Sequence, residues 1–213
     1  MKLTKKLITA VFLLAGIKFC AFCTPLTLNS VCKDLSSNSV TSGDFVQIKT
    51  ISTSKGPREL KSAGNFIFCL QGILWNTQKP FPSQMIITLS KITQTNAKGV
   101  TSTIEASENP TFSSIAKSLT AVFSGDISVL EENFKTEFSQ DSGNSWTINL
   151  YPKNEVFAKS IQQIKLSGNL NTNEKAQLDE IELSENQNSK IKYLFQNQKF
   201  KKELSENEKA LFY

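Results

Sequence analysis

The sequence predicts an α+β domain built on a single, strongly curved antiparallel sheet of about ten or eleven strands. The first observation is that apolar residues recur at every second position in many short segments, as in "NFIFCLQGILWNTQKPFPSQMIITL" at residues 65–89. The second is that these segments follow one another without the helical alternation that a parallel sheet requires. The third is a central stretch where the period changes to three or four, which predicts helices that cover the concave face of the sheet.

The chain starts with a basic and then apolar leader, so we expect residues 1–23 to be a cleaved secretory signal peptide. Its apolar run, from Leu7 to Ile17, is about half the length of a membrane-spanning helix. A retained membrane anchor and lipidation of a cysteine are the alternatives. We expect residues 24–213 to form one domain, because sheets of this kind commonly reach this size as a single unit.

Most of the positive charge belongs to the leader. The whole chain has a formal net charge of +5, and residues 1–23 contain four lysines and no acidic residue, which leaves +1 for the remainder (5 − 4 = 1). A protein that binds nucleic acid needs clustered Lys and Arg to neutralise phosphates. The only dense basic run left is the segment "KFKK" at residues 199–202, so nucleic acid is not expected as a partner.

The sequence of the first half of the domain predicts one helix and about five strands. The helix should run from Leu26 to Leu35, before a polar linker, and the first strand from Gly43 to Thr53. We expect "STSKGPREL" to be a turn, followed by the strands of residues 65–89. Two further strands, "LSKITQT" and "VTSTIEA", should be joined by a polar turn at residues 96–99.

The second half predicts helices and then five more strands. An amphipathic helix with apolar residues at steps of three and four should end near Phe123, and a short helical turn should follow at residues 127–132. Alternating apolar positions then return in five segments, which are "FKTEFSQ", "WTINLYP", "IQQIKLSG", "AQLDEIELSE" and "IKYLFQNQ".

The order of these segments and two motifs resemble the periplasmic lipoprotein carrier family, LolA. In that family a strand that ends in Trp is followed by a basic turn, a Pro and a strand with Ile, which here are Trp75, Lys79-Pro80 and Ile86-Ile87. A later strand of the family ends in Leu-x-Pro-Lys, which here is Leu150, Pro152 and Lys153. The likeness covers roughly residues 26–200.

The resemblance implies a half-open β-barrel whose concave face is closed by a helical lid. It implies a monomeric carrier in the periplasm that binds the acyl chains of outer-membrane lipoproteins without covalent chemistry or a cofactor. Its implied partners are acylated lipoproteins or lipids, an inner-membrane lipoprotein-releasing transporter and an outer-membrane acceptor. The family adds strand structure at the C-terminus, so Leu211, Phe212 and Tyr213 should pack on the barrel; a helix or a free tail is the alternative.

The sequence departs from the family at the lid. Family members typically carry an Arg-Pro pair before the Trp strand, and the Arg hydrogen-bonds the backbone of the closed lid. The corresponding pair here is Cys69-Leu70, and Lys79 lies in the next turn. Either apolar contacts alone hold the cavity shut, or the chain is a divergent relative with a different lipidic cargo.

Parity along the strands, together with the resemblance, selects candidate cavity residues. Those on the sheet side are Phe66, Phe68, Ile73, Trp75, Met85 and Ile87, and those on the lid side are Phe112, Ile115, Leu119 and Phe123. An ordinary hydrophobic core is the alternative for each of them. A bulge, expected at Gly72, would move the following side chains to the other face.

Two cysteines remain after the leader, Cys32 in the first helix and Cys69 in a strand. They could form one disulfide bridge in an oxidising compartment, and the alternative is two separate buried thiols. No spacing typical of a metal site is present.

The residue inventory argues against an enzyme. The chain contains no His, the commonest general base and metal ligand. Paired carboxylates, such as Glu131 and Glu132, lie on polar segments where a solvated face is expected. The remaining alternative is a non-binding structural module of the cell envelope, whose interior would be filled by its own side chains.

Overall fold

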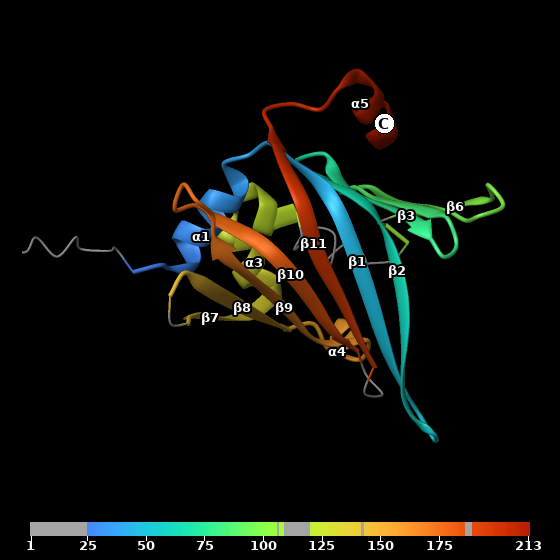
Figure 1. Ribbon diagram of the computed structural model, residues 1–213, viewed down its shortest axis with the longest axis horizontal. Coiled ribbons are helices and arrows are strands. Elements are labelled where there is room, and N and C mark those ends of the chain that lie inside the picture. The colour runs from blue at the N-terminus through green and yellow to red at the C-terminus, as the bar shows by residue number, and fades with distance from the viewer. Residues whose placement is uncertain (1–24, 106, 109–119, 142, 186–188) are drawn as a thin grey trace, which may run out of the picture.

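Eleven antiparallel strands form one open sheet that curls around a set of helices (Figure 1). The computed structural model describes residues 25–105, 107–108, 120–141, 143–185 and 189–213. The strands are β1 (Val40–Thr53), β2 (Gly56–Cys69), β3 (Gly72–Lys79), β4 (Ser83–Ile87), β5 (Lys91–Thr95), β6 (Thr101–Glu105), β7 (Phe134–Gln140), β8 (Ser145–Pro152), β9 (Ile161–Leu170), β10 (Ala176–Glu185) and β11 (Ser189–Lys201). The predicted fold class, a single curved antiparallel sheet with helices, is confirmed.

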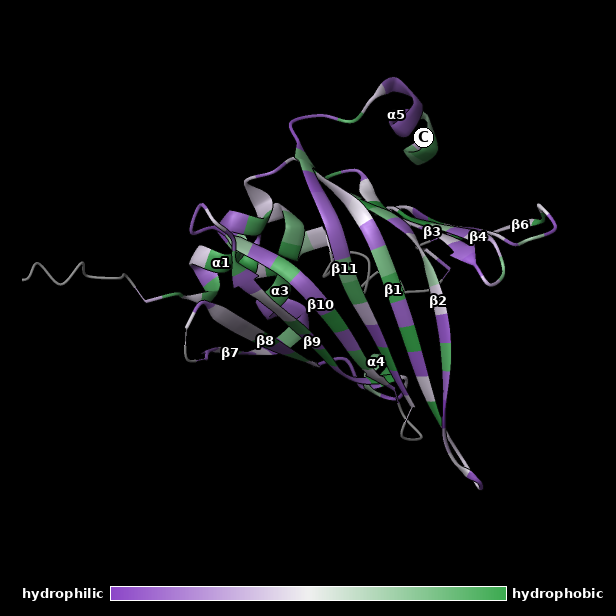
Figure 2. Cartoon of the chain, viewed as in Figure 1, coloured by the Kyte–Doolittle hydropathy of each residue, from purple (hydrophilic) through white to green (hydrophobic). Residues whose placement is uncertain are grey.

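The sheet has two halves that meet at its centre. The strand order is β6-β5-β4-β3-β2-β1-β11-β10-β9-β8-β7, so each half is a meander and the two halves are joined by the pairing of β1 with β11. In that pairing Phe45 lies opposite Phe195. Hydrophobic and hydrophilic bands alternate along these long central strands (Figure 2), as expected when successive side chains point to opposite faces.

The helices are short and are placed by local capping. They are α1 (Leu28–Ser36), α3 (Ile127–Asn133), α4 (Glu155–Ala158) and α5 (Glu206–Phe212), and residues 120–124 are also helical. At the start of α1, the Thr27 hydroxyl accepts a hydrogen bond from the Ser30 backbone N–H at 3.1 Å. At the start of α5, the Glu208 carboxylate accepts one from the Ser205 N–H at 2.8 Å. Both are capping boxes, which satisfy backbone donors that the first helical turn leaves free.

Two hydrophobic clusters lie on opposite faces of the sheet. The larger one fills the concave face, where side chains from nearly all the strands meet α1, α3 and residues 120–124. The smaller one lies on the convex face, where Leu204 and Phe212 of the C-terminal segment cover Ile67, Leu74 and neighbouring side chains. Ile67 and Leu74 are strand neighbours of the concave residues, so the alternation of side chains separates the two clusters.

Several local expectations are wrong. Strand β2 begins at Gly56, so most of the segment expected as a turn is strand. The C-terminus is a helix, which was the alternative to a further strand; Phe212 packs on the sheet as expected, but Leu211 and Tyr213 are exposed. No register shift occurs at Gly72; the shift in the pairing of β2 with β3 lies between Ala63 and Gly64. Leu70 and Leu89, which continue the apolar alternation in sequence, are exposed beyond the ends of their strands.

No described helix is both long enough and apolar enough to span a bilayer. The predicted signal peptide, residues 1–23, lies outside the described residues.

Candidate functional site

The six sheet residues selected from the sequence lie together on the concave face. Phe66 pairs with Trp75 and Phe68 with Ile73 between β2 and β3, and the next pairs, Trp75 with Met85 and Ile73 with Ile87, continue into β4. All six belong to the concave cluster or pack against it. Their shared face is therefore as expected, and their contact with a ligand stays a prediction.

These six side chains differ in how deeply they are covered. Phe66, Phe68, Ile73 and Ile87 are buried, whereas Trp75 and Met85 are only partly buried at the margin of the cluster. The protein's own side chains therefore fill much of the concave floor in this structure.

An aromatic group forms the centre of the floor, and three of its members were not selected from the sequence: Phe45, Tyr193 and Phe195. The Phe68 ring lies 5.4 Å from the Phe195 ring, and the Trp75 ring lies 5.3 Å from the Tyr193 ring, measured between centroids. In the sequence, the signal for these three residues was their alternating apolar positions in predicted strands. Alternation alone does not show that β11 lies beside β1, so the sequence could not show that they lie beside the selected residues.

One of the four lid residues can be placed. Phe123 lies in the helical segment 120–124, and its ring stacks on Phe68 with centroids 4.3 Å apart and planes 28° apart. Phe112, Ile115 and Leu119 lie outside the described residues. The stacking shows that this segment contacts the concave floor through apolar surface.

Gly125 ends this helical segment and brings it close to α1. Its φ of 73° is the left-handed conformation common after a helix, and the Asp126 N–H returns to the Ala121 carbonyl at 3.0 Å. A Cβ at position 125 would lie 2.6 Å from the Ser36 hydroxyl oxygen. The turn that carries Phe123 onto the floor therefore requires glycine here.

A cavity of about 520 Å³ lies where the helices meet one rim of the sheet. Its apolar lining comes from two turns of the sheet, at Leu70 and Leu89, and from Ala121 and Val129 on the helical side. Leu70 and Leu89 are 57% and 53% exposed, respectively. Exposed apolar side chains that border a hollow are typical of a binding mouth.

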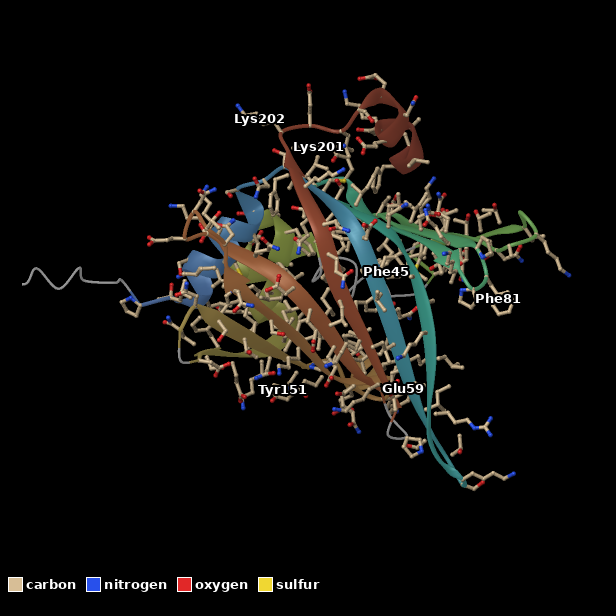
Figure 3. The ribbon with its side chains drawn as sticks, in the orientation of Figure 1. Phe45, Glu59, Phe81, Tyr151, Lys201 and Lys202 are labelled. Atoms are coloured by element: carbon tan, nitrogen blue, oxygen red, sulfur yellow. The ribbon has the colours of Figure 1, made fainter. Side chains whose placement is uncertain are left out.

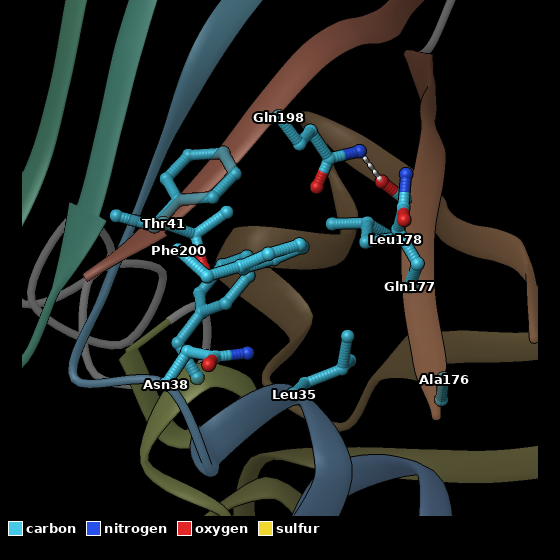
Figure 4. Close-up of a pocket in the computed structure, with 10 residues that line it drawn as sticks. Leu35, Asn38, Thr41, Ala176, Gln177, Leu178, Gln198 and Phe200 are labelled. Carbon is cyan, nitrogen blue, oxygen red and sulfur yellow. Dashed lines mark hydrogen bonds between the residues drawn. The ribbon is translucent and has the colours of Figure 1, made fainter. Parts of the chain in front are cut away.

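A second hollow, between α1 and strands β1, β10 and β11, is nearly closed (Figure 4). Its volume of about 10 Å³ is close to the space of a single water molecule. Phe68, Phe123 and Leu35 are among its lining residues, and Gln198 Nε2 donates to the Leu178 carbonyl at 2.7 Å beside it. The stacked rings and α1 thus close this side of the floor.

The concave face becomes polar along β1 and β11, away from the aromatic group. The Ser62 hydroxyl donates to Gln47 Oε1 at 2.6 Å, and Gln47 Nε2 donates to the Tyr193 hydroxyl at 3.2 Å. Lys49 and Glu185 form an ion pair at 3.2 Å. Burial, and then the negative charge of Glu185, raise the pKa of Tyr193 to about 12, so its hydroxyl stays protonated.

A hollow of about 400 Å³ lies at this polar end, lined in part by Leu60, Pro80 and Phe81. Phe81 extends from the corner between β3 and β4 (Figure 3) and is exposed. It gives a second, smaller apolar surface far along the sheet from the cavity at the rim.

The possible disulfide between Cys32 and Cys69 is not formed: both cysteines are free and buried. Cys32 belongs to the concave cluster and Cys69 to the convex one, so the sheet separates them. Burial raises the pKa of the Cys32 thiol to about 11. The alternative of two separate buried thiols is therefore the one that the structure has.

Among the described residues, no group of three or more His, Cys, Asp or Glu side chains is arranged to hold a metal ion. The site combines apolar walls, an aromatic floor and a helical cover, which together suit the binding of an apolar ligand.

Three solved structures match this chain over most of its length, each at 9% sequence identity. A DUF1329 family protein from Desulfovibrio piger matches 87% of this chain and 94% of its own with a TM-score of 0.48. A putative outer membrane lipoprotein-sorting protein domain from Vibrio parahaemolyticus matches 87% and 96% with a TM-score of 0.45. A LolA superfamily protein from Nitrosomonas europaea matches 86% and 97% with a TM-score of 0.44.

The comparison with curated proteins finds no match to this chain. The model of one protein family, described as outer membrane lipoprotein carrier protein LolA, matches residues 36–208. This match spans both meanders of the sheet and the helices between them, and it agrees with the resemblance seen in the Trp75 and Leu150 motifs. The chain belongs to the LolA family of outer membrane lipoprotein carrier proteins.

Proposed function

We infer that this protein is a non-catalytic carrier that binds the acyl chains of lipoproteins on the concave face of its sheet. The observation that carries the proposal is the cavity of about 520 Å³, which is bordered by exposed Leu70 and Leu89 and by the helical segment whose Phe123 lies on the aromatic floor. The volume lies within the roughly 300–1,000 Å³ range of small-molecule sites. Family membership supports a cargo of lipoprotein or lipid.

Apolar burial supplies the binding free energy in this proposal. Each methylene that leaves water contributes about 0.8 kcal/mol, so even part of one long acyl chain would outweigh the cost of ordering it. The floor residues Phe66, Phe68 and Ile73 are already buried by other protein groups. Acyl chains therefore enter first at the rim and reach the floor only when the helical cover moves.

The helical cover acts as a lid in this proposal. Phe123 occupies floor area that a ligand would use, and its contact with Phe68 is an apolar ring stack without a hydrogen bond between the side chains. Such a contact can be replaced by another apolar group at little cost, so a ligand that binds the open state shifts the population towards it. This is consistent with a lid that closes without the Arg typical of the family.

Transport requires a compartment and membrane partners. We place the mature chain, residues 24–213, in the periplasm as a monomer after removal of the signal peptide of residues 1–23. It would receive cargo from an inner-membrane lipoprotein-releasing transporter and deliver it to an outer-membrane acceptor. A carrier of other lipids or hydrophobic ligands is the alternative, and the choice of probe below separates the two.

The test uses a peptide whose N-terminal cysteine carries an S-dipalmitoylglyceryl group, with binding measured by native mass spectrometry and by fluorescence titration. Leu89→Glu should weaken binding at least tenfold, because a charge would replace part of the apolar wall of a mouth that Asp126 and Glu132 already border. Leu60→Glu is the matched control, since Leu60 is 58% exposed but lies in the other hollow. Phe68 is 2% exposed, so a charge there would disrupt the core as well.

Equal binding by wild type and Leu89→Glu would overturn the assignment of the mouth. Binding of free lipid without binding of the acylated peptide would favour the alternative cargo.

A further inference from the structure

Both tryptophans of the chain keep a buried indole N–H without a hydrogen-bond partner among the described residues. A buried donor that has lost its water and gained no acceptor is unfavourable for folding. Such groups are uncommon, and each one calls for a physical reason.

The two indoles lie in different surroundings. Trp146 is 0% exposed in β8, where its ring lies over Gly168 of the neighbouring strand. Trp75 is only partly buried, on the candidate binding face. Its ring lies between Phe68, at 5.5 Å, and Tyr193, at 5.3 Å. Trp146 is therefore enclosed in the core, whereas Trp75, with its unpartnered N–H, lies at the margin of the concave cluster, on the face proposed for the acyl chain.

A second donor lies beside Trp75. The hydroxyl of Tyr193 accepts from Gln47, and Gln47 accepts from Ser62, so the direction of donation runs towards Tyr193. A phenol has one proton to donate, and Tyr193 does not donate it to Gln47. Trp75 and Tyr193 thus bring two hydrogen-bond donors to the border between the aromatic floor and the polar end.

The charge of this region favours a neutral acceptor. Lys49 lies on the same strand and face as Gln47, but its ammonium is paired with Glu185 at 3.2 Å and Glu185 also accepts from the Ser189 hydroxyl at 2.7 Å. The ion pair leaves no free positive charge from Lys49 for a phosphate or carboxylate. Two donors with no excess charge suit a carbonyl oxygen, which has two lone pairs and no proton.

We propose that the Trp75 N–H, together with the Tyr193 hydroxyl, binds the carbonyl oxygen of an ester- or amide-linked acyl group, so that the protein selects acylated ligands over plain alkyl chains. The inference rests on the proposed function, because it places the acyl chain on the concave floor. It adds a polar criterion to a site whose other contacts are apolar. Apolar contacts alone do not distinguish an ester from an ether of similar length.

The experiment compares two peptides that differ only in this group: one carries two palmitoyl esters on its S-glyceryl cysteine, and the other two hexadecyl ethers. Since the chain has two tryptophans, a ¹⁵N-labelled sample shows two indole N–H signals, which Trp75→Phe assigns. The ester peptide should move the Trp75 signal downfield and leave Trp146 in place. The ether peptide should not produce this downfield shift.

Affinities give the second readout. Trp75→Phe keeps an aromatic ring but removes the donor, so it should weaken binding of the ester peptide about two- to tenfold more than binding of the ether peptide. Tyr193→Phe should act in the same direction. Trp146→Phe, the matched control, removes an equally unpartnered N–H from the other half of the sheet and should leave the ester preference intact.

Equal indole shifts with both peptides, or an unchanged ester preference in Trp75→Phe, would overturn the proposal. If wild type binds both peptides equally well, the carrier function stands and carbonyl recognition fails. If wild type binds neither, the proposed function itself fails, and this inference with it. The wild-type indole spectrum decides the question even if a variant does not fold.

Discussion

The stacked pair of Phe68 and Phe123 predicts a variant that binds ligand more tightly while being less stable. The Phe123 ring lies 4.3 Å from the Phe68 ring and occupies the floor that an acyl chain would use. In Phe123→Ala, the closed lid loses this contact, and a ligand no longer has to displace it. Stability and affinity should therefore change in opposite directions.

The size of the effect follows from burial. Truncation of a fully buried Phe to Ala costs about 3–5 kcal/mol, and an aromatic pair adds about 0.5–1.5 kcal/mol to its area term. Because Phe123 is only partly buried, we expect a loss of about 2 kcal/mol in the free energy of unfolding. If Phe123→Ala destabilises only the closed state of the lid, the affinity for the acyl ligand should rise by up to roughly thirtyfold, at 1.4 kcal/mol per factor of ten.

The assay combines urea denaturation with competition titration of a fluorescent fatty acid. Phe157→Leu is the control: Phe157 is buried in α4, meets Phe134 at 5.9 Å and does not line the cavity at the rim, so the change should lower stability without raising affinity. The reasoning is refuted if Phe123→Ala loses affinity together with stability, because Phe123 would then be a ligand contact and not a competitor.

Three further predictions concern the fold. Gly168→Ala should lower the free energy of unfolding by about 1–3 kcal/mol, because an added Cβ would overlap the Gln177 carbonyl. The melting temperature should fall by about 2–4 °C for each kcal/mol, and an unchanged melting curve would contradict this. Cys32, buried and with its pKa raised to about 11, should not react with a thiol reagent at neutral pH until urea unfolds the chain; rapid reaction of the native protein would argue against this packing. The Ser205 backbone N–H is the chief cause of a lowered pKa at Glu208. The Glu208 carboxylate should therefore stabilise α5 fully above its ordinary pKa of 4.5, and this stabilisation should be lost as pH falls through the lowered pKa. Hydrogen exchange of α5 measures this loss, and exchange that does not change with pH in this range would contradict the cap.

Much of the fold could be predicted because its strands carry their own pattern. The alternation in "NFIF" and "GILW" correctly placed Phe66, Phe68, Ile73 and Trp75 on one face, and the five later segments are all strands. The pattern misled at Leu70 and Leu89, where the chain turns and alternation no longer relates a side chain to a face. It was wrong at the start of β2, where polar residues that were expected to form a turn continue a strand because the backbone ladder with β1 continues.

The candidate site was less predictable because it depends on contacts between distant segments. Local alternation by itself determined which side chains share a face, since that follows from the geometry of each strand. Only the tertiary structure decided that β1 pairs with β11, which brings Tyr193 to Trp75 and Phe195 to Phe68. It also placed Cys32 and Cys69 on opposite sides of the sheet. The physical reason is that the pairing and curvature of strands distant in sequence depend on how the whole apolar face is buried, and no single segment encodes that arrangement.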